Sequence, residues 1–523
     1  MGRIRRGKLE IDPTRNPAVL DAATWDAAAA WAVVRAVPEP FWQSAAGGKV
    51  RVYPGSRVRH GQSEYALVGL PDGQHVLIQF GPSDVPPPLG QPIGEKTANG
   101  TRQAAYATDA ATLDRFCRLV CPPKGPRALG ATPRLGIGCR MSAAIWPGVW
   151  PAMEKGRFAA NAIQNSLREL NLLDDLCAGR PARSNYMFGF GRLDEGHTGS
   201  TFEGLWVYGL LEALKSGTCP RYGADADHIM VKRTPDGLER AKQVIAAARY
   251  YTFFTLDVSD ILDYGAMSAA AKYSAALNAV EELVEHIRRL KEGVPFDLEL
   301  SIDESPPGVP TFETVTTETE LAFLLGEIER RRLPITHVAP NLGVEKGSDY
   351  RCPDGLEGLE RRTRALHRML NERGLMLDCH SGDDLSPATR RVVGRATDGV
   401  NHFKISPCLQ VLFGETLNGL YPEEFRFWWD DTMAYAAREA DGGAKFAAQC
   451  IHEYEAAERR VPSPRHSVFH HFCFATVGRR DADGQFIHRE RFYSLPPAFY
   501  QEYHRRVERL LCEVAADVFS VAP

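Results

Sequence analysis

Hydrophobic positions follow two different patterns along the chain. Between residues 49 and 80, short runs of alternating apolar residues (50–53, 65–68 and 75–80) are separated by Gly and Asp, which predicts β-strands. The Pro- and Gly-rich stretch 81–100 is expected to be a linker or surface loop. We therefore expect residues 1–135 to form a β-rich N-terminal domain.

From residue 136 to the C-terminus, strand-like runs alternate with segments of helical spacing. The candidate strands are 158–163, 221–227, 251–257, 296–301, 335–340, 375–380, 400–405 and 467–474. Between them, Thr317 and Glu320 form a capping box ahead of an apolar helical stripe, and Gly293 and Gly374 are expected to end two other helices. Eight such alternations predict an α/β fold, a (β/α)8 TIM-like barrel over residues 136–523.

Polar residues cluster where the predicted strands end. Chemistry in such a barrel belongs at the C-terminal ends of the strands, and acids and histidines fall at five of them: Asp225, Asp227 and His228; Asp257; Glu299, Asp303 and Glu304; Asp378, His380, Ser381, Asp383 and Asp384; His402 with Lys404. Any one of these could be a helix cap or a loop-facing residue. Buried carboxylates are costly unless they bind a metal, pair with a cation or transfer protons, so the joint placement favours an active site.

Composition narrows the class of protein. The formal net charge is −4, with 44% hydrophobic and 24% charged residues, so no basic surface argues for nucleic acid or an anionic membrane. The alanine-rich run 22–37 is too short to span a bilayer. Eleven cysteines without a Cys-x-x-Cys pair suit reduced thiols. We expect a cytoplasmic enzyme.

Three other histidine positions are interpreted as structural. His197 follows an expected insertion loop and is expected to be solvated. His337 is expected to fill the barrel interior. The pair His470 and His471 lies in the last predicted strand, where one side chain should be buried and the other exposed.

Several ordered segments carry a resemblance to a known family. They are residues 136–141, 162–169, 223–228, 254–260, 296–304, 339–350 and 380–384, closed by 402–404. From about Gly136 to the C-terminus the chain resembles the tagaturonate epimerase family, bacterial and archaeal enzymes that interconvert tagaturonate and fructuronate. The resemblance implies a carbohydrate epimerase, an isomerase, that acts on a small sugar or sugar acid.

The chain departs from the family pattern at several positions. Cys139 replaces an aspartate, and His337 replaces a residue that is not histidine. Asp383 replaces a serine and Leu385 a lysine, and the turn after Lys404 differs as well. The lost lysine and gained aspartate make the site more negative, so the substrate is expected to be a keto-uronate, a related ketose or a different sugar acid.

The family reaction inverts the hydroxyl-bearing carbon β to a ketone, whose proton is not acidic. Two routes remain: retro-aldol cleavage followed by re-addition, or transient oxidation by a nicotinamide. The segment Gly136-x-Gly138 lacks the third glycine of a dinucleotide-binding fingerprint. Retro-aldol cleavage needs a Lewis acid and a carboxylate that takes the hydroxyl proton.

The resemblance and this chemistry together assign roles to strand-end residues. His228, His380 and His402 are expected to bind a divalent metal cation, with Zn, Mn, Ni and Fe as candidates. Asp227 is expected to be the base and Glu299 the opposing acid, although either could be a metal ligand. The residues expected to bind substrate are Arg140, Gln164, Asn165, Asp257, Lys346, Asp349 and Lys404. Two alternatives stay open: a metal-dependent aldolase, and an inactive paralogue that binds a sugar acid.

Overall fold

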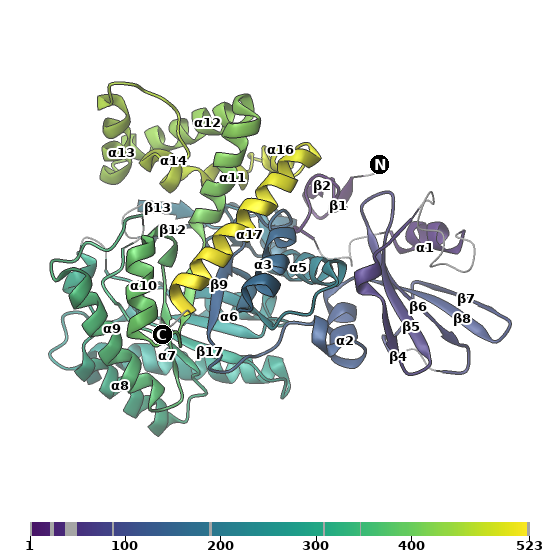
Figure 1. The fold of residues 1–523 in the computed structure, drawn as a ribbon, viewed down its shortest axis with the longest axis horizontal. Coiled ribbons are helices and arrows are strands. Elements are labelled where there is room, and N and C mark those ends of the chain that lie inside the picture. The colour runs from purple at the N-terminus through teal and green to yellow at the C-terminus, as the bar shows by residue number, and fades with distance from the viewer. Residues whose placement is uncertain are drawn as a thin grey trace.

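The computed structural model describes residues 3–20, 26–36, 50–85, 88–187, 191–306, 309–345 and 347–519. Figure 1 shows two parts, an antiparallel sheet near the N-terminus and a larger barrel with surrounding helices. No helix within these ranges is apolar enough over sufficient length to cross a membrane. All eleven cysteines are free thiols, in agreement with the expectation from the sequence.

The N-terminal part is a six-stranded sheet, which confirms the predicted β-rich segment. Its strands are β3 (Arg51–Val52), β4 (Val58–His60), β5 (Ser63–Gly69), β6 (His75–Pro82), β7 (Gly94–Ala98) and β8 (Thr101–Ala107), with α1 (Ala27–Arg35) packed beside it. The prediction of a loop over 81–100 was wrong in part, because it contains β7. This edge strand is mostly polar and solvent-facing, as edge strands often are, so it lacks the apolar alternation of a strand.

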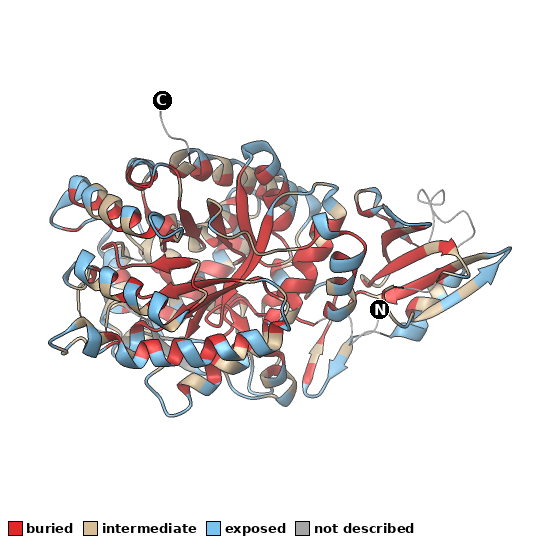
Figure 2. Ribbon diagram, turned by 90° about the horizontal axis from the view of Figure 1, so that it is seen from below, coloured by how far each residue is buried: buried red, intermediate tan, exposed pale blue. Residues whose placement is uncertain are grey.

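The barrel confirms the predicted fold class. Its eight parallel strands close in the order β10-β15-β16-β17-β18-β19-β20-β9. They are β9 (Arg134–Gly138), β10 (Ala159–Ser166), β15 (Tyr222–Met230), β16 (Phe253–Asp257), β17 (Asp297–Ser301), β18 (His337–Ala339), β19 (Met376–Cys379) and β20 (His402–Ile405). Figure 2 shows the buried residues concentrated in these strands and on the helix faces turned toward them.

One predicted strand was wrong. Residues 467–472 form the helix α14 (Ser467–Phe472), and the remaining barrel strand is β9, which precedes all the candidate strands. The buried residues Val468, Phe469 and Phe472 have helical spacing, whereas we interpreted the apolar run as a strand. β9 escaped prediction because it is short and contains two glycines and an arginine.

Helices surround the barrel. They are α2 (Ala110–Leu119), α3 (Trp146–Gly156), α5 (Phe202–Ser216), α6 (Gly237–Ala247), α7 (Ala269–Lys291), α8 (Glu318–Arg331), α9 (Gly355–Asn371), α10 (Pro387–Ala396) and α17 (Pro497–Phe519). The capping box of Thr317 and Glu320 is present at the start of α8. α7 ends two residues before Gly293, and α9 ends shortly before Gly374. These predicted features are confirmed.

A further group of helices lies beside one end of the barrel (Figure 1). It comprises α11 (Pro407–Leu420), α12 (Pro422–Asp441), α13 (Lys445–Ala456), α14, α15 (Phe474–Val477) and α16 (Arg489–Phe492). Besides several short 3-10 helices, the other described elements are α4 (Leu173–Ala178) and three two-stranded sheets: β1 (Ile4–Arg6) with β2 (Leu9–Ile11), β11 (Leu170–Asn171) with β14 (Ser200–Thr201), and β12 (Ser184–Met187) with β13 (Gly191–Asp194). α14 contributes residues to the pocket described next.

Candidate active site at the barrel mouth

A pocket that is partly open to solvent lies at the C-terminal ends of the barrel strands. Barrel strands, the loops after them and α14 all line it. The polar residues of the lining are Arg140, Gln164, Arg168, Glu169, His197, Asp227, His228, His380, Ser381, Asp383, Asp384, Lys404, Ser406, Gln410, His470 and His471. The pocket therefore contains acids, histidines and cations from segments far apart in the sequence, at the place predicted for chemistry.

Lys404 is the centre of a buried charge cluster. Its ammonium nitrogen lies 2.9 Å from Asp227 Oδ1, 2.8 Å from Glu299 Oε2 and 3.4 Å from Asp225 Oδ2. Thr255 Oγ1 accepts a further hydrogen bond of 2.9 Å. Lys404 is only 4% exposed, so little water weakens these interactions.

The carboxyl groups around Lys404 differ in their pKa values. Burial opposes ionisation of Asp227 and Glu299, yet the Lys404 ammonium holds the pKa of both carboxyls below the ordinary values. Burial instead raises the pKa of Asp225 to about 7, although Lys404 acts to lower it. Asp227 is therefore an ionised carboxylate at the pocket wall, as a general base requires.

His228 reaches the pocket through an irregularity in β15. The register between β15 and β16 shifts between Ala226 and Ile229, and His228 has a left-handed backbone with φ of 41°. Such a bulge redirects a side chain. His228 Nδ1 lies 3.2 Å from Asp257 Oδ2, so a carboxylate fixes the orientation of this ring.

His380 lies edge-to-face with His228, with ring centroids 4.7 Å apart. Its Nε2 is 2.6 Å from Glu299 Oε1 and its Nδ1 is 3.1 Å from Asp303 Oδ2. Burial opposes the imidazolium, but Asp303 and Glu299 raise the pKa of His380 to about 10. The ring is therefore positively charged between two carboxylates.

The residues at this point fit a divalent metal. His228, Asp303 and His380 each offer one ligand atom, and the three atoms lie within 4.8 Å of one another. Two imidazoles and a carboxylate suit Zn²⁺ and similar ions, and a histidine ligand is often held by a carboxylate, as Asp257 holds His228. A metal bound here would take the place of the proton on His380, because only a neutral imidazole can be a ligand.

The third predicted metal ligand lies elsewhere. His402 Nδ1 is 2.7 Å from Asp378 Oδ2, and the groups of metal-ligating atoms among the described residues place His402 with His337 and Asp378. The structure thus brings His228 and His380 together but not His402. His337 is fully buried, as expected.

The predicted substrate-binding residues divide into two groups. Arg140, Gln164 and Lys404 line the pocket, and Gln164 Nε2 donates to Asp227 Oδ2 at 3.2 Å. The others do not line it: Asn165 donates to a backbone carbonyl, Asp257 supports His228, and Asp349 is an exposed residue that accepts hydrogen bonds at the start of α10. Lys346 lies outside the described residues.

Several pocket residues were missed from the sequence. His197 was expected to be solvated, which is wrong, because it is 5% exposed and its Nε2 lies 3.2 Å from Arg140 Nη1. Arg140 also lies 3.0 Å from Glu169 Oε1. Arg168 forms ion pairs with Glu304 and Asp257. The segment 162–169 contained Arg168 and Glu169, but nothing local indicated that a distant loop would bring His197 to them.

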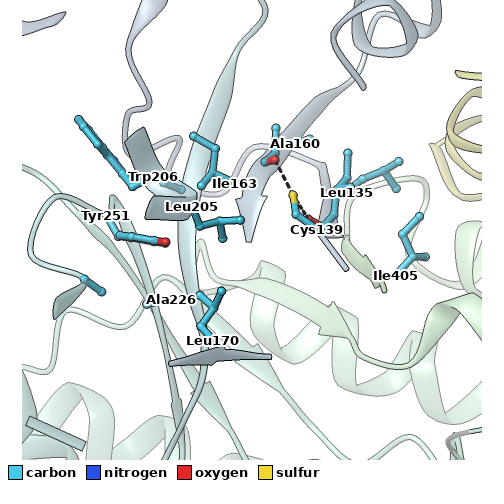
Figure 3. Close-up of a cluster of buried hydrophobic side chains, with 14 of the residues drawn as sticks. Leu135, Cys139, Ala160, Ile163, Leu170, Leu205, Trp206, Ala226, Tyr251 and Ile405 are labelled. Atoms are coloured by element: carbon cyan, nitrogen blue, oxygen red, sulfur yellow. Dashed lines mark hydrogen bonds between the residues drawn. The ribbon is translucent and has the colours of Figure 1, made fainter. Parts of the chain in front are cut away.

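The departures from the family pattern have different structural settings. Cys139 is fully buried in a hydrophobic cluster with Leu135 and Ile163, where Figure 3 shows it, and burial raises the pKa of its thiol to about 12. Leu385 is also in the core, 2% exposed. Asp383 does line the pocket.

Asp383 and Asp384 form an acidic pair at the rim. Burial and the neighbouring Asp384 raise the pKa of Asp383 to about 7. Asp384 accepts a hydrogen bond from the backbone of Gly347 at 2.6 Å and lies 2.9 Å from His470 Nε2. The acids raise the pKa of His470, although burial acts against this. His470 of α14, which we did not select from the sequence, thus compensates part of the added negative charge.

Comparisons with known proteins support the fold. Neither protein-family models nor curated proteins give a match. A crystal structure of fructuronate-tagaturonate epimerase UxaE from Cohnella laeviribosi, with one glycerol, matches with a TM-score of 0.64 and 18% identity, over 94% of this chain and 99% of that one. This chain has the fold of that epimerase.

Two further crystal structures of the same enzyme give the same result. The complex with two glycerols has a TM-score of 0.65 and 18% identity, covering 94% of this chain and 100% of that one. The native structure has a TM-score of 0.62 and 18% identity, covering 91% and 98%. The resemblance inferred from short ordered segments is therefore confirmed at the level of the fold.

Proposed function

We propose that the protein is a metal-dependent carbohydrate epimerase that inverts the hydroxyl-bearing carbon β to the ketone of a keto-uronate or related ketose. The observation that carries the proposal is the buried Asp227–Lys404–Glu299 arrangement beside the His228–Asp303–His380 cluster. Of these residues, Asp227, Lys404, His228 and His380 line one pocket. A fold shared with a fructuronate-tagaturonate epimerase supports the substrate class.

The residues suit a retro-aldol route. Asp227, held ionised by Lys404, takes the proton of the β-hydroxyl. The bond between the α and β carbons then breaks, its electron pair moves toward the ketone, and the β carbon becomes an aldehyde. A divalent metal on His228, Asp303 and His380 would supply Lewis acidity to the ketone. Rotation of the aldehyde and re-formation of the same bond invert the carbon.

A proton must also return to the oxygen of the re-formed hydroxyl. Glu299 lies across the Lys404 ammonium from Asp227, at 2.8 and 2.9 Å respectively. Since Glu299 is itself ionised, it cannot donate, and we assign the proton donor for the re-formed hydroxyl to the Lys404 ammonium, which then recovers a proton from Asp227 at 2.9 Å. Glu299 keeps Lys404 charged, in place of the acid role expected from the sequence.

The pocket also offers groups for the rest of the substrate. Arg140 and Arg168 line the side formed after β9 and β10, and guanidinium groups bind carboxylates well. Gln164 and Ser406 provide hydrogen-bonding groups for hydroxyls. We assign a substrate carboxylate to the side of Arg140 and Arg168.

Metal removal and product analysis test the proposal. Protein stripped with a chelator should lose activity on a panel of ketoses and keto-uronates and regain it with Zn²⁺, Mn²⁺, Ni²⁺ or Fe²⁺. Asp227→Asn should abolish turnover while still binding metal. Activity that persists after complete metal removal would contradict the metal-dependent mechanism.

The products separate the proposal from its alternatives. An epimerase yields one isomer of unchanged mass, whereas an aldolase on the same residues yields two shorter fragments. Ligand-dependent thermal stabilisation without turnover on the whole panel would instead indicate a sugar-acid-binding protein without activity.

A further inference from the structure

A second histidine–carboxylate cluster lies deeper in the barrel than the pocket. It consists of His337 of β18, Asp378 of β19 and His402 of β20, each fully buried. One ligand atom of each lies within 4.8 Å of the other two. His402 is two residues before Lys404 on the same strand face, so it lies roughly 7 Å further from the mouth. None of the three lines the pocket.

The hydroxyl of Thr336 contacts one ring nitrogen of His337. Thr336 Oγ1 accepts from the Leu298 N–H at 2.9 Å and lies 2.7 Å from His337 Nδ1. The carbonyl of Leu298, 3.1 Å from Thr336 Oγ1, already accepts a hydrogen bond from the Thr336 N–H. In the tautomer in which Nδ1 donates to Thr336 Oγ1, the Nε2 atom of His337 offers a lone pair to a cation.

His402 is held in the same way. Its Nδ1 donates to Asp378 Oδ2 at 2.7 Å, which leaves its Nε2 as a lone-pair acceptor. A carboxylate that orients a histidine in this way is typical of metal sites.

Two ring nitrogens of the cluster lack a hydrogen-bond partner. His337 Nε2 and His402 Nε2 have none among the described residues, whereas Asp378 hydrogen-bonds Glu299 as well as His402. Gln164 Oε1 has no partner either, and it lies near His402 Nε2: a Cβ built on Gly136 would be 2.6 Å from the first and 3.0 Å from the second. Leaving such buried groups unpaired is costly, and a cation between the two rings would pair both nitrogens.

The spacing of the two rings agrees with a cation between them. The ring centroids of His337 and His402 are 5.6 Å apart, and two imidazoles on one Zn²⁺ place their centres roughly 5–6 Å apart, since Zn–N is about 2 Å. Charges of both signs act on the rings, namely Glu299 and the cations Lys404 and Arg134, so the geometry of the rings, and not the charge around them, supports the site.

We propose that His337, Asp378 and His402 form a second metal site, which binds a divalent transition-metal ion of the Zn²⁺ type inside the barrel. His337 stands where the resembled family has another residue, so the site is a feature of this chain rather than of the family pattern. The interior ion neutralises buried acids beneath the pocket, and it is independent of the metal at the mouth.

Metal counting on the intact chain tests the site. Protein stripped of metal, reloaded with Zn²⁺ and desalted should contain about two equivalents of zinc per chain, one for each cluster. His337→Asn should retain about one equivalent, and His228→Asn, the matched change at the mouth, should also retain about one. Circular dichroism and thermal melting of each variant check that it is folded.

Two variants of the neighbouring Thr336, which do not change a proposed ligand, test the site if His337→Asn fails to fold. Thr336→Val removes the hydroxyl that contacts His337 Nδ1, and Thr336→Ser keeps it. Loss of such a supporting contact typically weakens metal affinity by about 10–100-fold, so a Zn²⁺ titration should show this change for Thr336→Val alone, in one of two binding steps.

Two results would overturn the proposed interior site. If folded His337→Asn binds as much zinc as the unchanged protein, or if Thr336→Val leaves every binding step unchanged, water and not a metal satisfies these acceptors and the proposal is overturned. The mouth site is judged separately by His228→Asn, so failure of the interior site leaves the proposed function untouched.

Discussion

Replacing Lys404 with Met tests how the charges of the candidate site are held together. The side chain is 4% exposed, and its ammonium contacts Asp227, Glu299 and Asp225. Met has a similar length but no charge, so the variant leaves these acids buried without their cation. Removing one partner of a buried ion pair costs about 3–5 kcal/mol, and we expect the free energy of unfolding near pH 8 to fall by that amount.

The loss should shrink as the pH falls. In the unchanged protein Lys404 keeps the pKa of Asp227 and Glu299 low, while Asp225 titrates at about 7. Without Lys404, burial raises the folded-state pKa of these carboxyls above the unfolded values. The folded variant then binds more protons than the unfolded chain, so its stability increases toward low pH, by about 1.4 kcal/mol per pH unit for each proton.

Lys291→Met is the matched control. Lys291 is another buried lysine, but its ammonium donates to the carbonyls of Arg249 and Tyr251 at 3.2 and 2.6 Å and not to carboxylates. Burial lowers its pKa to about 8, so both the folded and the unfolded chain are protonated well below this value. The cost of Lys291→Met should therefore be nearly constant from about pH 5 to 7.

Urea denaturation with a chelator present, at about pH 5, 6.5 and 8, measures both variants. Chelation keeps bound metal from contributing to the free energy. The reasoning is refuted if Lys404→Met is equally destabilised at pH 5 and pH 8, or if Lys291→Met shows the same dependence over this range. Either result would mean that carboxylates around Lys404 do not depend on its charge.

Two further predictions concern the departures from the family pattern. Asp383→Ser should raise the ratio of kcat/KM for a keto-uronate to kcat/KM for the neutral ketose by about tenfold, which corresponds to about 1.4 kcal/mol. This increase should be larger at pH 8 than at pH 6, because the pKa of Asp383 is about 7. An unchanged ratio would count against a role of Asp383 in substrate selection. Cys139→Asp should lower the free energy of unfolding by about 3 kcal/mol or more, because it buries a carboxylate in a hydrophobic cluster. Chemical denaturation measures this loss, with Cys139→Ala as the control. A stable Cys139→Asp variant would show that the side chain at this position can reach polar surroundings.

Local sequence patterns predicted most of the barrel. Seven of the eight barrel strands overlap predicted strands, because a parallel strand buried on both faces is a continuous apolar run. The failures have local causes. β7 is a polar edge strand, β9 contains two glycines, and α14 has apolar residues so closely spaced that a strand and a helix look alike.

The site was predicted less completely, because its geometry depends on depth in the barrel. His402 and Lys404 lie on the same face of β20, and their sequence spacing places both inside. Only the closed barrel shows that Lys404 reaches the pocket while His402 pairs with Asp378. Residues such as His197 and His470 come from segments far from the strands, and no local pattern predicts that they line the pocket.

The residues that differ from the family pattern change the charge of the pocket lining less than their side chains alone suggest. Cys139 and Leu385 face the core, so neither the missing acid nor the missing lysine changes the pocket lining directly. The added acid is at Asp383, next to Asp384 and within the field of His470. Arg140 and Arg168 remain at the pocket wall. Because these arginines can bind a carboxylate, the single added acid at Asp383 is not a sufficient reason to expect that the pocket excludes acidic sugars.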